Sequence, residues 1–343
     1  MAEDHLSSEF NSRYSIPARK MIRMVSENSR IKITEMAKKL DMSRRTVAVK
    51  LANLEKELGI RYTIEFDEEK LELNRQHLIM VKFGSKPDYG KITETLGRSY
   101  IPQIAVEVKG TYDMLVYANA MSGTEYARWD RAMQMLLSPY KPTWQASEVV
   151  HRQLGFFPLR NEIIDMTRVS PKYKRMLKIL NGNSRISFQE LARNLNMNVN
   201  TAVYNFNKLV SLGYIKSFTA TMDMPKDMSL MTFFSRYTPS DGYEGASSKA
   251  RALFMSDDPE PLVSRYLLTA PLIGGYDFFT LGAFDNHETA YKEDVLCHKH
   301  IFRKYNIRIL YGDVRRILLG RIPIRSVDTK ANYKTIVWST DSI

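Results

Sequence analysis

The chain has 343 residues, enough for two or more domains, and 44% of them are hydrophobic, as in an ordinary globular protein. Lys and Arg number 50 against 38 Asp and Glu, and the formal net charge of +12 favours a polyanionic partner such as nucleic acid. A single cysteine excludes a disulfide framework and a multi-cysteine zinc finger. The sequence shows neither the roughly 18–20 apolar residues of a membrane helix nor a signal-peptide core, so we expect a cytoplasmic protein.

The sequence repeats itself at the spacing of a whole domain. Asn-Ser-Arg-Ile at 28–31 recurs 155 residues later at 183–186, and eight of the fifteen positions from 28 to 42 are identical at this offset. A second match joins Gly-Thr-Tyr-Asp at 110–113 to Gly-Gly-Tyr-Asp at 274–277. A repeat of this length predicts two tandem copies of one module.

Apolar residues at helical spacing predict three short helices at the start of each copy. In the first copy the third helix runs from about 44 to 58 behind Ser43, a favoured N-cap, and in the second copy it begins at Asn198. The stripes on the first two helices are Ala18, Met21, Ile22 and Val25, then Ile33, Met36, Ala37 and Leu40, repeated as Tyr173, Met176, Leu177 and Leu180, then Phe188, Leu191, Ala192 and Leu195. With a hairpin of 60–66 and 70–73 turning at 67–69, this pattern predicts a winged helix-turn-helix.

The first turn of the third helix faces the major groove in such units. Arginine there can pair with guanine or with phosphate, and asparagine can pair with adenine. We therefore expect DNA contacts from Ser43, Arg44, Arg45, Thr46 and Lys50, and from Asn198, Asn200, Thr201 and Asn205. The alternatives are a solvated helix face for the two arginines and helix capping alone for Asn198.

The second part of each copy is predicted to be βαββαβ, which makes the chain an α+β protein with ferredoxin-like sheets. The predicted elements are 77–84, 89–96, 104–109, 112–120, 125–137 and 143–150, then 231–237, 246–255, 263–270, 276–284, 289–304 and 307–314. Helices on one face leave the other face open, which predicts packing of the two sheets against each other or against copies in a second chain. The candidate core of that contact is Val81, Phe83, Val116 and Ala118 with Phe233, Phe278 and Thr280.

A winged helix followed by βαββαβ, with Gly-x-Tyr-Asp entering the third strand, resembles the Lrp/AsnC family of feast-or-famine regulators. The resemblance covers nearly the whole chain, and the signature occurs twice. It implies DNA binding, dimerisation through the sheets, and a small effector, often an amino acid, near that strand connection. The positions implied here are Gly110, Tyr112, Asp113, Gly274, Tyr276 and Asp277, with a plain tight turn as the alternative. Because family members usually carry one module, this chain is expected to form an internal pseudo-dimer and a homo-oligomer.

These patterns divide the chain into five segments. We expect a first winged helix at 1–76, a ferredoxin-like domain at 77–152, a linker with a second winged helix at 153–224, a second ferredoxin-like domain at 225–322, and a tail at 323–343. The connection 154–167 is too apolar for a free linker and is expected to pack. In the tail, Tyr333, Ile336, Val337 and Trp338 could form an extra strand.

Enzyme motifs are missing from the sequence. It has no phosphate loop, metalloprotease helix or nucleophile elbow, and the cluster Cys297, His298 and His300 has too few neighbouring ligands for a metal. We therefore expect a DNA-binding transcriptional regulator that has no enzymatic activity, cofactor or metal. One alternative is a chromatin-organising protein. The other is a tetrapyrrole enzyme, because siroheme decarboxylases look like the same domain combination and use histidine and arginine, although sheet histidines are few here (His77 and His151).

Overall fold

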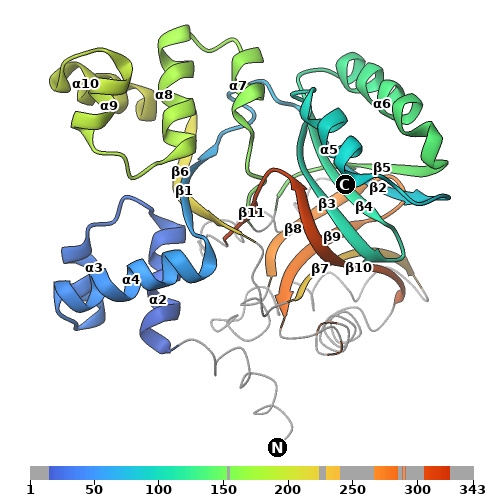
Figure 1. Cartoon of the computed structure of the whole chain (residues 1–343), viewed down its shortest axis with the longest axis horizontal. Coiled ribbons are helices and arrows are strands. Elements are labelled where there is room, and N and C mark those ends of the chain that lie inside the picture. Colours follow the sequence, from blue (N-terminus) through green and yellow to red (C-terminus); the bar gives the residue numbers. More distant parts are fainter. Residues whose placement is uncertain are drawn as a thin grey trace, which may run out of the picture.

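The computed structural model describes residues 15–152, 155–223, 229–239, 266–284, 288, 290 and 305–324. Two groups of short helices lie at the left of Figure 1, and a large β structure lies at the right. A small sheet of three strands lies between them. The predicted α+β class is therefore confirmed.

The predicted three-helix pattern is present in both helical groups. The first contains α2 (Ile16–Glu27), α3 (Ile33–Leu40) and α4 (Arg44–Leu58), followed by β1 (Arg61–Phe66). The second contains α8 (Pro171–Gly182), α9 (Phe188–Leu195) and α10 (Val199–Ser211), followed by β6 (Ile215–Met222). We call these groups, with their strands, the first HTH unit (16–66) and the second HTH unit (171–222). Their predicted apolar stripes supply buried core residues such as Met21, Met36, Met176 and Leu191.

The predicted wing hairpin is wrong. Residues 67–72 form a hydrogen-bonded turn, in which Leu71 N donates to Asp67 O at 3.1 Å, and no strand forms at 70–73. Leu71 and Leu73 are buried, so this segment packs into the core instead of returning as an exposed strand. β1 pairs antiparallel with β6 of the other unit, with Thr63 opposite Thr219, and β11 (Ile322–Pro323) pairs with the other edge of β6.

The βαββαβ order is confirmed in the first half of the chain. It comprises β2 (Arg75–Phe83), α5 (Tyr89–Gly97), β3 (Pro102–Gly110), β4 (Met114–Ala120), α6 (Gly123–Leu137) with the 3-10 turn η1 (Ser138–Tyr140), and β5 (Pro142–Val149). The second half supplies the four strands β7 (Ser229–Pro239), β8 (Tyr266–Ile273), β9 (Phe278–Phe284) and β10 (Tyr305–Leu319). The helix predicted at 246–255, nearly all of the one predicted at 289–304, and the tail strand lie outside the described residues.

The two four-stranded sheets close into one barrel. The strand order is β10-β3-β4-β2-β5-β8-β9-β7, and β7 pairs again with β10. Each sheet therefore joins the other at both of its edges, through β3 with β10 and through β5 with β8. Closure satisfies the hydrogen-bonding groups that a sheet edge would otherwise expose.

The two sheets face each other across the barrel interior, but the residues predicted for that contact are wrong by one position. Val81, Phe83, Val116 and Ala118 pack under α5 and α6, and Phe233 packs on the opposite side from the interior with Phe284 and Ala290. Phe278 and Thr280 flank Phe279, which belongs to the interior cluster. Both faces of these strands are apolar, so alternation with a period of two cannot tell which face is inward. The interior is filled by the alternate positions, including Leu78, Met80, Leu115, Tyr117, Phe234 and Phe279.

The apolar connection between the halves packs as predicted. Phe156, Phe157 and Leu159 are buried, and the Phe157 ring stacks on Tyr117 with centroids 3.7 Å apart. α7 (Asn161–Met166) follows this segment.

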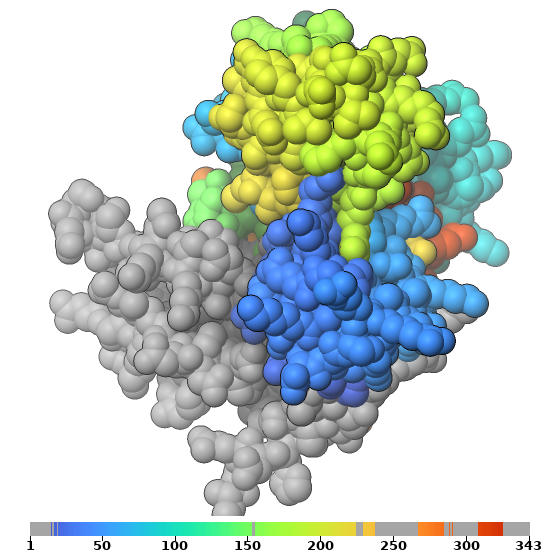
Figure 2. All heavy atoms as spheres, turned by 90° about the vertical axis from the view of Figure 1, so that its left-hand side faces the viewer, coloured from blue at the N-terminus to red at the C-terminus, as the bar shows by residue number. Residues whose placement is uncertain are grey.

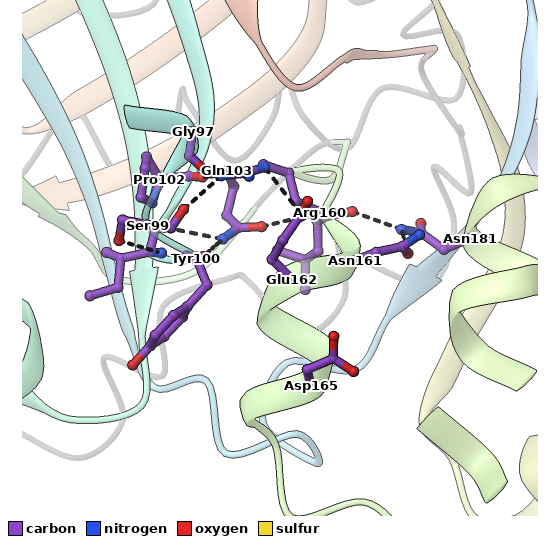
Figure 3. A network of polar contacts seen from close by, with 12 residues as sticks. Gly97, Ser99, Tyr100, Pro102, Gln103, Arg160, Asn161, Glu162, Asp165 and Asn181 are labelled. Atoms are coloured by element: carbon purple, nitrogen blue, oxygen red, sulfur yellow. Dashed lines mark hydrogen bonds and ion pairs between the residues drawn. The ribbon is translucent and has the colours of Figure 1, made fainter. Parts of the chain in front are cut away.

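Arg160 anchors the connection to the barrel. Its guanidinium donates to Ser99 O and Pro102 O at 2.9 Å and to Gly97 O at 3.2 Å, as Figure 3 shows. On the other side, Asn181 of α8 donates to Leu159 O at 2.9 Å. The second HTH unit is therefore attached to the barrel by directed hydrogen bonds as well as by chain connectivity.

In the ranges that the structure describes, no helix has the length and apolar character needed to cross a membrane.

Acid should destabilise the barrel through His77. Its ring stacks on Tyr126 with centroids 3.5 Å apart, and its buried Nδ1 has no hydrogen-bond partner among the described residues. Burial lowers the pKa of His77 below its ordinary value. The folded protein then binds fewer protons than the unfolded chain, so stability is present above the unfolded pKa of about 6.5 and is lost as pH falls below it.

We expect the His77→Phe variant, which keeps a stacked ring, to lose less stability than the native chain between about pH 7 and pH 5.5. Urea unfolding across that range measures the effect. Burial also lowers the pKa of His151, so His151→Gln serves as a separate control for the second histidine. Parallel pH profiles for the His77→Phe variant and the native chain would contradict the assignment to His77.

Candidate nucleic-acid interface

The two HTH units lie next to each other on one side of the molecule. Figure 2 shows this side, with the second unit in yellow-green above the first unit in blue. The β1–β6 pairing connects them over the register from Arg61–Thr221 to Phe66–Ile215. The main-chain hydrogen bonds of this pairing therefore fix the distance between the two units on this side of the molecule.

The repeated Asn-Ser-Arg-Ile tetrapeptide lies at the junction of the two units. The Ser29 and Ser184 hydroxyls, 155 residues apart, share a buried hydrogen bond of 2.6 Å. Ser29 N donates to Phe218 O at 2.9 Å, and in return Ser184 N donates to Tyr62 O at 3.1 Å. Contacts that exchange the equivalent residues are the mark of a twofold arrangement. The repeat in the sequence thus has a structural counterpart, which is an internal near-twofold axis between the units.

The first turn of α4 is outward and basic. Ser43 Oγ accepts from Thr46 N at 3.1 Å and caps the helix, while Val47 and Leu51 turn its inner face into the core. Arg44 and Arg45 are exposed, and within the described structure neither guanidinium has a hydrogen bond or ion pair. Thr46 and Lys50 are also exposed. The predicted residues therefore lie together at the start of α4 and along it. The Ser43 hydroxyl, however, already accepts the capping hydrogen bond of this helix.

The first turn of α10 is outward but uncharged. Asn198 Oδ1 accepts from Thr201 N at 2.8 Å, so Asn198 caps its helix as Ser43 does. Asn200 and Thr201 are exposed. The basic residue of this helix, Lys208, lies in its last turn.

Asn205 does not lie on the surface that was predicted for it. It is buried, and it accepts a hydrogen bond from Lys172 Nζ at 2.9 Å. It continues the inward stripe of Ala202, Phe206 and Leu209, so its position follows from helical spacing. Tyr204, one residue earlier, is 63% exposed and was missed, although the same spacing places it outward.

The two Gly-x-Tyr-Asp motifs lie at the two seams of the barrel. A Cβ at Gly110 would lie 2.6 Å from Tyr311 O of β10, and one at Gly274 would lie 3.3 Å from Ser147 Cα of β5. The absence of a side chain at Gly110 therefore permits β10 to approach the end of β3, and its absence at Gly274 permits β5 to approach the end of β8. The tyrosines that follow are buried and pack edge-on against Phe234, at 5.7 Å for Tyr112 and 5.6 Å for Tyr276.

The polar groups of these motifs are used in the fold. Tyr112 OH shares a hydrogen bond of 2.5 Å with Thr232 Oγ1. Asp113 accepts from Phe83 N and from Lys82 Nζ, both at 2.7 Å, and Asp277 N donates to Ser235 O at 2.9 Å. Inside the barrel, an apolar cavity of about 30 Å³ has room for about one water molecule. An effector at Gly110–Asp113 or Gly274–Asp277 stays a prediction, and it would have to replace these contacts.

A buried ionic cluster, not singled out from the sequence, lies where β1 leads toward the barrel. Arg152 contacts Glu68 directly and lies 3.7 Å from Glu65 Oε1. Burial raises the pKa of Glu68 even though Arg152 opposes that rise. Two carboxylates sharing one largely buried guanidinium are a feature that only the folded chain reveals, because Arg152 lies 84 residues after Glu68 in the sequence.

No metal site is evident in the part of the chain that the structure describes, where no three His, Cys, Asp or Glu side chains come together as ligands. The Cys297, His298 and His300 cluster lies outside the described residues.

Comparison with known proteins supports the DNA-binding character of the second unit. A family model described as winged helix-turn-helix DNA-binding matches residues 174–216, which cover most of that unit. A search of the curated proteins finds no match.

Solved structures with low sequence identity share this fold. Two crystal structures of the siroheme decarboxylase NirDL, one in complex with an iron-uroporphyrin III analogue, match with a TM-score of 0.53, at 12% and 10% identity. They cover 90% and 93% of this chain and 94% and 95% of theirs. An AsnC family transcriptional regulator from Agrobacterium tumefaciens matches at 15% identity and a TM-score of 0.37, over 43% of this chain and 98% of that one.

The match to NirDL corrects one expectation. We inferred from the missing catalytic motifs that the chain is not an enzyme, and that inference is wrong, because a fold shared over nearly the whole chain is the fold of an enzyme. At 10–12% identity the likeness shows the architecture and not the activity.

Removing either helix cap should destabilise the fold. We expect Ser43→Ala and Asn198→Ala each to cost about 1 kcal/mol, because each leaves an orphan N–H at the start of α4 or α10. Chemical denaturation measures the loss. Ser43→Asn and Asn198→Ser keep a capping oxygen and should retain nearly all of the stability, and equal losses in the alanine and capping variants would contradict the capping role.

Proposed function

We propose that the protein is a DNA-binding transcriptional regulator of Lrp/AsnC type, built from two tandem modules, that acts on DNA in the cytoplasm. The observation that carries the proposal is the pair of HTH units held side by side, with two exposed guanidinium groups on the first turn of α4. The family match to a winged helix-turn-helix over 174–216 supports it.

The two units would make different kinds of contact with DNA. The net charge of +12 attracts the polyanion, and Arg44 and Arg45 can bind phosphate or guanine. The outward turn of α10 offers Asn200, Thr201 and Tyr204, which can donate and accept hydrogen bonds but neutralise no phosphate. Phosphate contacts position a protein on DNA and base contacts specify the sequence. We infer two unlike half-sites, with most of the salt dependence coming from the first unit.

Arg44→Ala with Arg45→Ala should weaken DNA binding by roughly 1–3 kcal/mol for each arginine that pairs with a base, and less if both arginines touch phosphate. The slope of log affinity against log salt should also become shallower, because fewer phosphates are neutralised. Fluorescence anisotropy on DNA fragments selected from genomic footprints measures both quantities.

Arg128→Ala with Arg131→Ala is the matched control. It removes the same charge from exposed positions of another helix, α6, which packs on the barrel. We expect a small effect from this control. An equal loss of affinity in both double variants would show that net charge alone drives binding, and unchanged affinity after substitution of Arg44 and Arg45 would remove α4 from the interface.

A second candidate function is binding and transformation of a tetrapyrrole that carries carboxylates. Its support is the fold shared with NirDL together with the buried Arg152, a guanidinium of the kind that pairs with carboxylates. The barrel cavity of about 30 Å³ is far smaller than a tetrapyrrole, so such a substrate would need space outside the barrel interior.

Titration of the purified full chain with iron-uroporphyrin III, followed through its Soret band, separates the two functions. A regulator retains DNA and leaves the added chromophore unchanged. A saturable shift of the band, weakened at least tenfold in an Arg152→Gln variant that remains folded, would establish the second candidate.

A further inference from the structure

The two HTH units exchange an arginine across their near-twofold junction. Arg30 of the first unit donates through Nη1 to Ser184 O at 2.5 Å and to Ile186 O at 3.3 Å in the second unit. Arg185 of the second unit donates through Nη1 to Tyr62 OH at 3.0 Å in the first unit. The two guanidinium groups, which belong to the repeated tetrapeptide, therefore occupy equivalent places in the two units.

The surroundings of Arg30 are filled by aromatic rings. Its Cζ lies 5.1 Å, 5.0 Å and 5.8 Å from the ring centroids of Phe188, Phe206 and Phe218. Phe188 and Phe206 also meet edge-on at 5.1 Å. Cation–π attraction and close packing hold this guanidinium, and the rings occupy the space around it.

The surroundings of Arg185 are open. The positions equivalent to Phe188 and Phe206, 155 residues earlier, are Ile33 and Leu51, whose side chains are shorter than a benzyl group. Beside them, Ala48 and Ala52 of α4 project only methyl groups. The result is a groove of about 370 Å³ between α4 and the 183–185 turn.

One end of the groove is polar. Arg185 Cζ lies 4.7 Å from the centroid of Tyr62, which takes the place of Phe218. Arg185 Nη1 also lies 3.9 Å from Glu55 Oε1, and its side chain is 23% exposed. Arg185 Nη2 also donates to Ile31 O at 3.5 Å. A guanidinium has five N–H donors, so these contacts leave donors for a ligand in the groove.

We propose that this groove binds a small aromatic carboxylate. The aryl ring would occupy, against Arg185, the place that Phe188 and Phe206 fill against Arg30, with Ile33 and Leu51 behind it. The carboxylate would accept hydrogen bonds from the Arg185 guanidinium, an arrangement in which planar donors match a planar acceptor. The site is separate from the outward first turn of α4, and its occupancy does not depend on the proposed DNA-binding function.

Two sources share this chemistry, namely plain aryl acids and aromatic amino acids. The ammonium group of an amino acid would meet Glu55, which also accepts a hydrogen bond from Tyr62 OH. Comparing 3-phenylpropanoate with L-phenylalanine therefore distinguishes the sources.

Calorimetric titration of the full chain provides the test. We expect saturable binding of 3-phenylpropanoate or L-phenylalanine with one site per chain, and no binding of butyrate, which lacks the ring, or of benzyl alcohol, which lacks the carboxylate. Tighter binding of L-phenylalanine assigns a role to Glu55, and tighter or equal binding of 3-phenylpropanoate assigns the groove to plain aryl acids. Failure of both aromatic compounds to bind at millimolar concentration would overturn the proposal.

Ala52→Leu places a larger side chain in the groove. Ala52 is an exposed helical position and leucine is a good helix former, so the fold should be kept. We expect at least tenfold weaker binding of the aromatic ligand. Ala127→Leu, at an exposed position of α6, is the matched control and should bind as the native chain does. Unchanged affinity in the Ala52→Leu variant would overturn the location of the site.

The equivalent place around Arg30 offers a test by gain of binding. Phe188→Ile with Phe206→Leu gives the second unit the residues that line the groove in the first, and we expect a second site for the same ligand. The measured stoichiometry should rise from one to two, and a value that stays at one in the folded variant would contradict the proposed equivalence. The Ala52→Leu comparison decides the assignment alone if this double variant does not fold.

Discussion

The antiparallel pairing of β1 with β6 is the contact on which the arrangement of the chain depends. It brings together two helical units that are far apart in sequence, and it aligns Thr63 with Thr219 near an internal axis. Each threonine then reaches into the neighbouring helices, since Thr219 Oγ1 donates to Ser26 O and Thr63 Oγ1 donates to Asn181 O. β1 continues through the segment 67–74 into β2 of the barrel, and β11, which follows the barrel strand β10, pairs with β6. This small sheet therefore connects the two HTH units with the barrel.

A nearly symmetric backbone carries unlike side chains, and the differences fall at the positions on which the two proposals rest. The outward first turn is basic in α4 and carries uncharged asparagine and threonine in α10. The exchanged arginine is enclosed by rings in one unit and borders a groove in the other. The main-chain contacts at the axis, by contrast, are reciprocal within a few tenths of an ångström, at 2.9 Å for Ser29 N and 3.1 Å for Ser184 N. The framework therefore holds its shape while the surfaces that it presents differ.

The helices of the two HTH units and the order of the described strands could be predicted because each shows a clear period and each occurs twice. The partner strand of β1 could not be predicted, because the short segment at 70–73 suggested a local hairpin with β1. In the structure Leu71 and Leu73 are buried, so this segment packs into the core. The inward face of the sheets was also missed, since Val81 and Met80 are both buried and alternation is uninformative there. For the candidate interface, position on the helix identified the outward Arg44 and Arg45. It was not applied to Asn205, which helical spacing places with Phe206 in the core. The groove at Arg185 depends on a contact between distant segments, so no local pattern signals it.

The pairing of the two units within one chain has a consequence for assembly. A dimer held by the same Ser29–Ser184 and β1–β6 contacts would separate on dilution. Units joined by a chain meet at an effective concentration of roughly millimolar or more, whatever the amount of protein present. Two helix-turn-helix units are therefore paired from the first molecule synthesised. For the proposed regulator, occupancy of a DNA site would then rise with the first power of protein concentration, without the threshold that a dissociating dimer imposes.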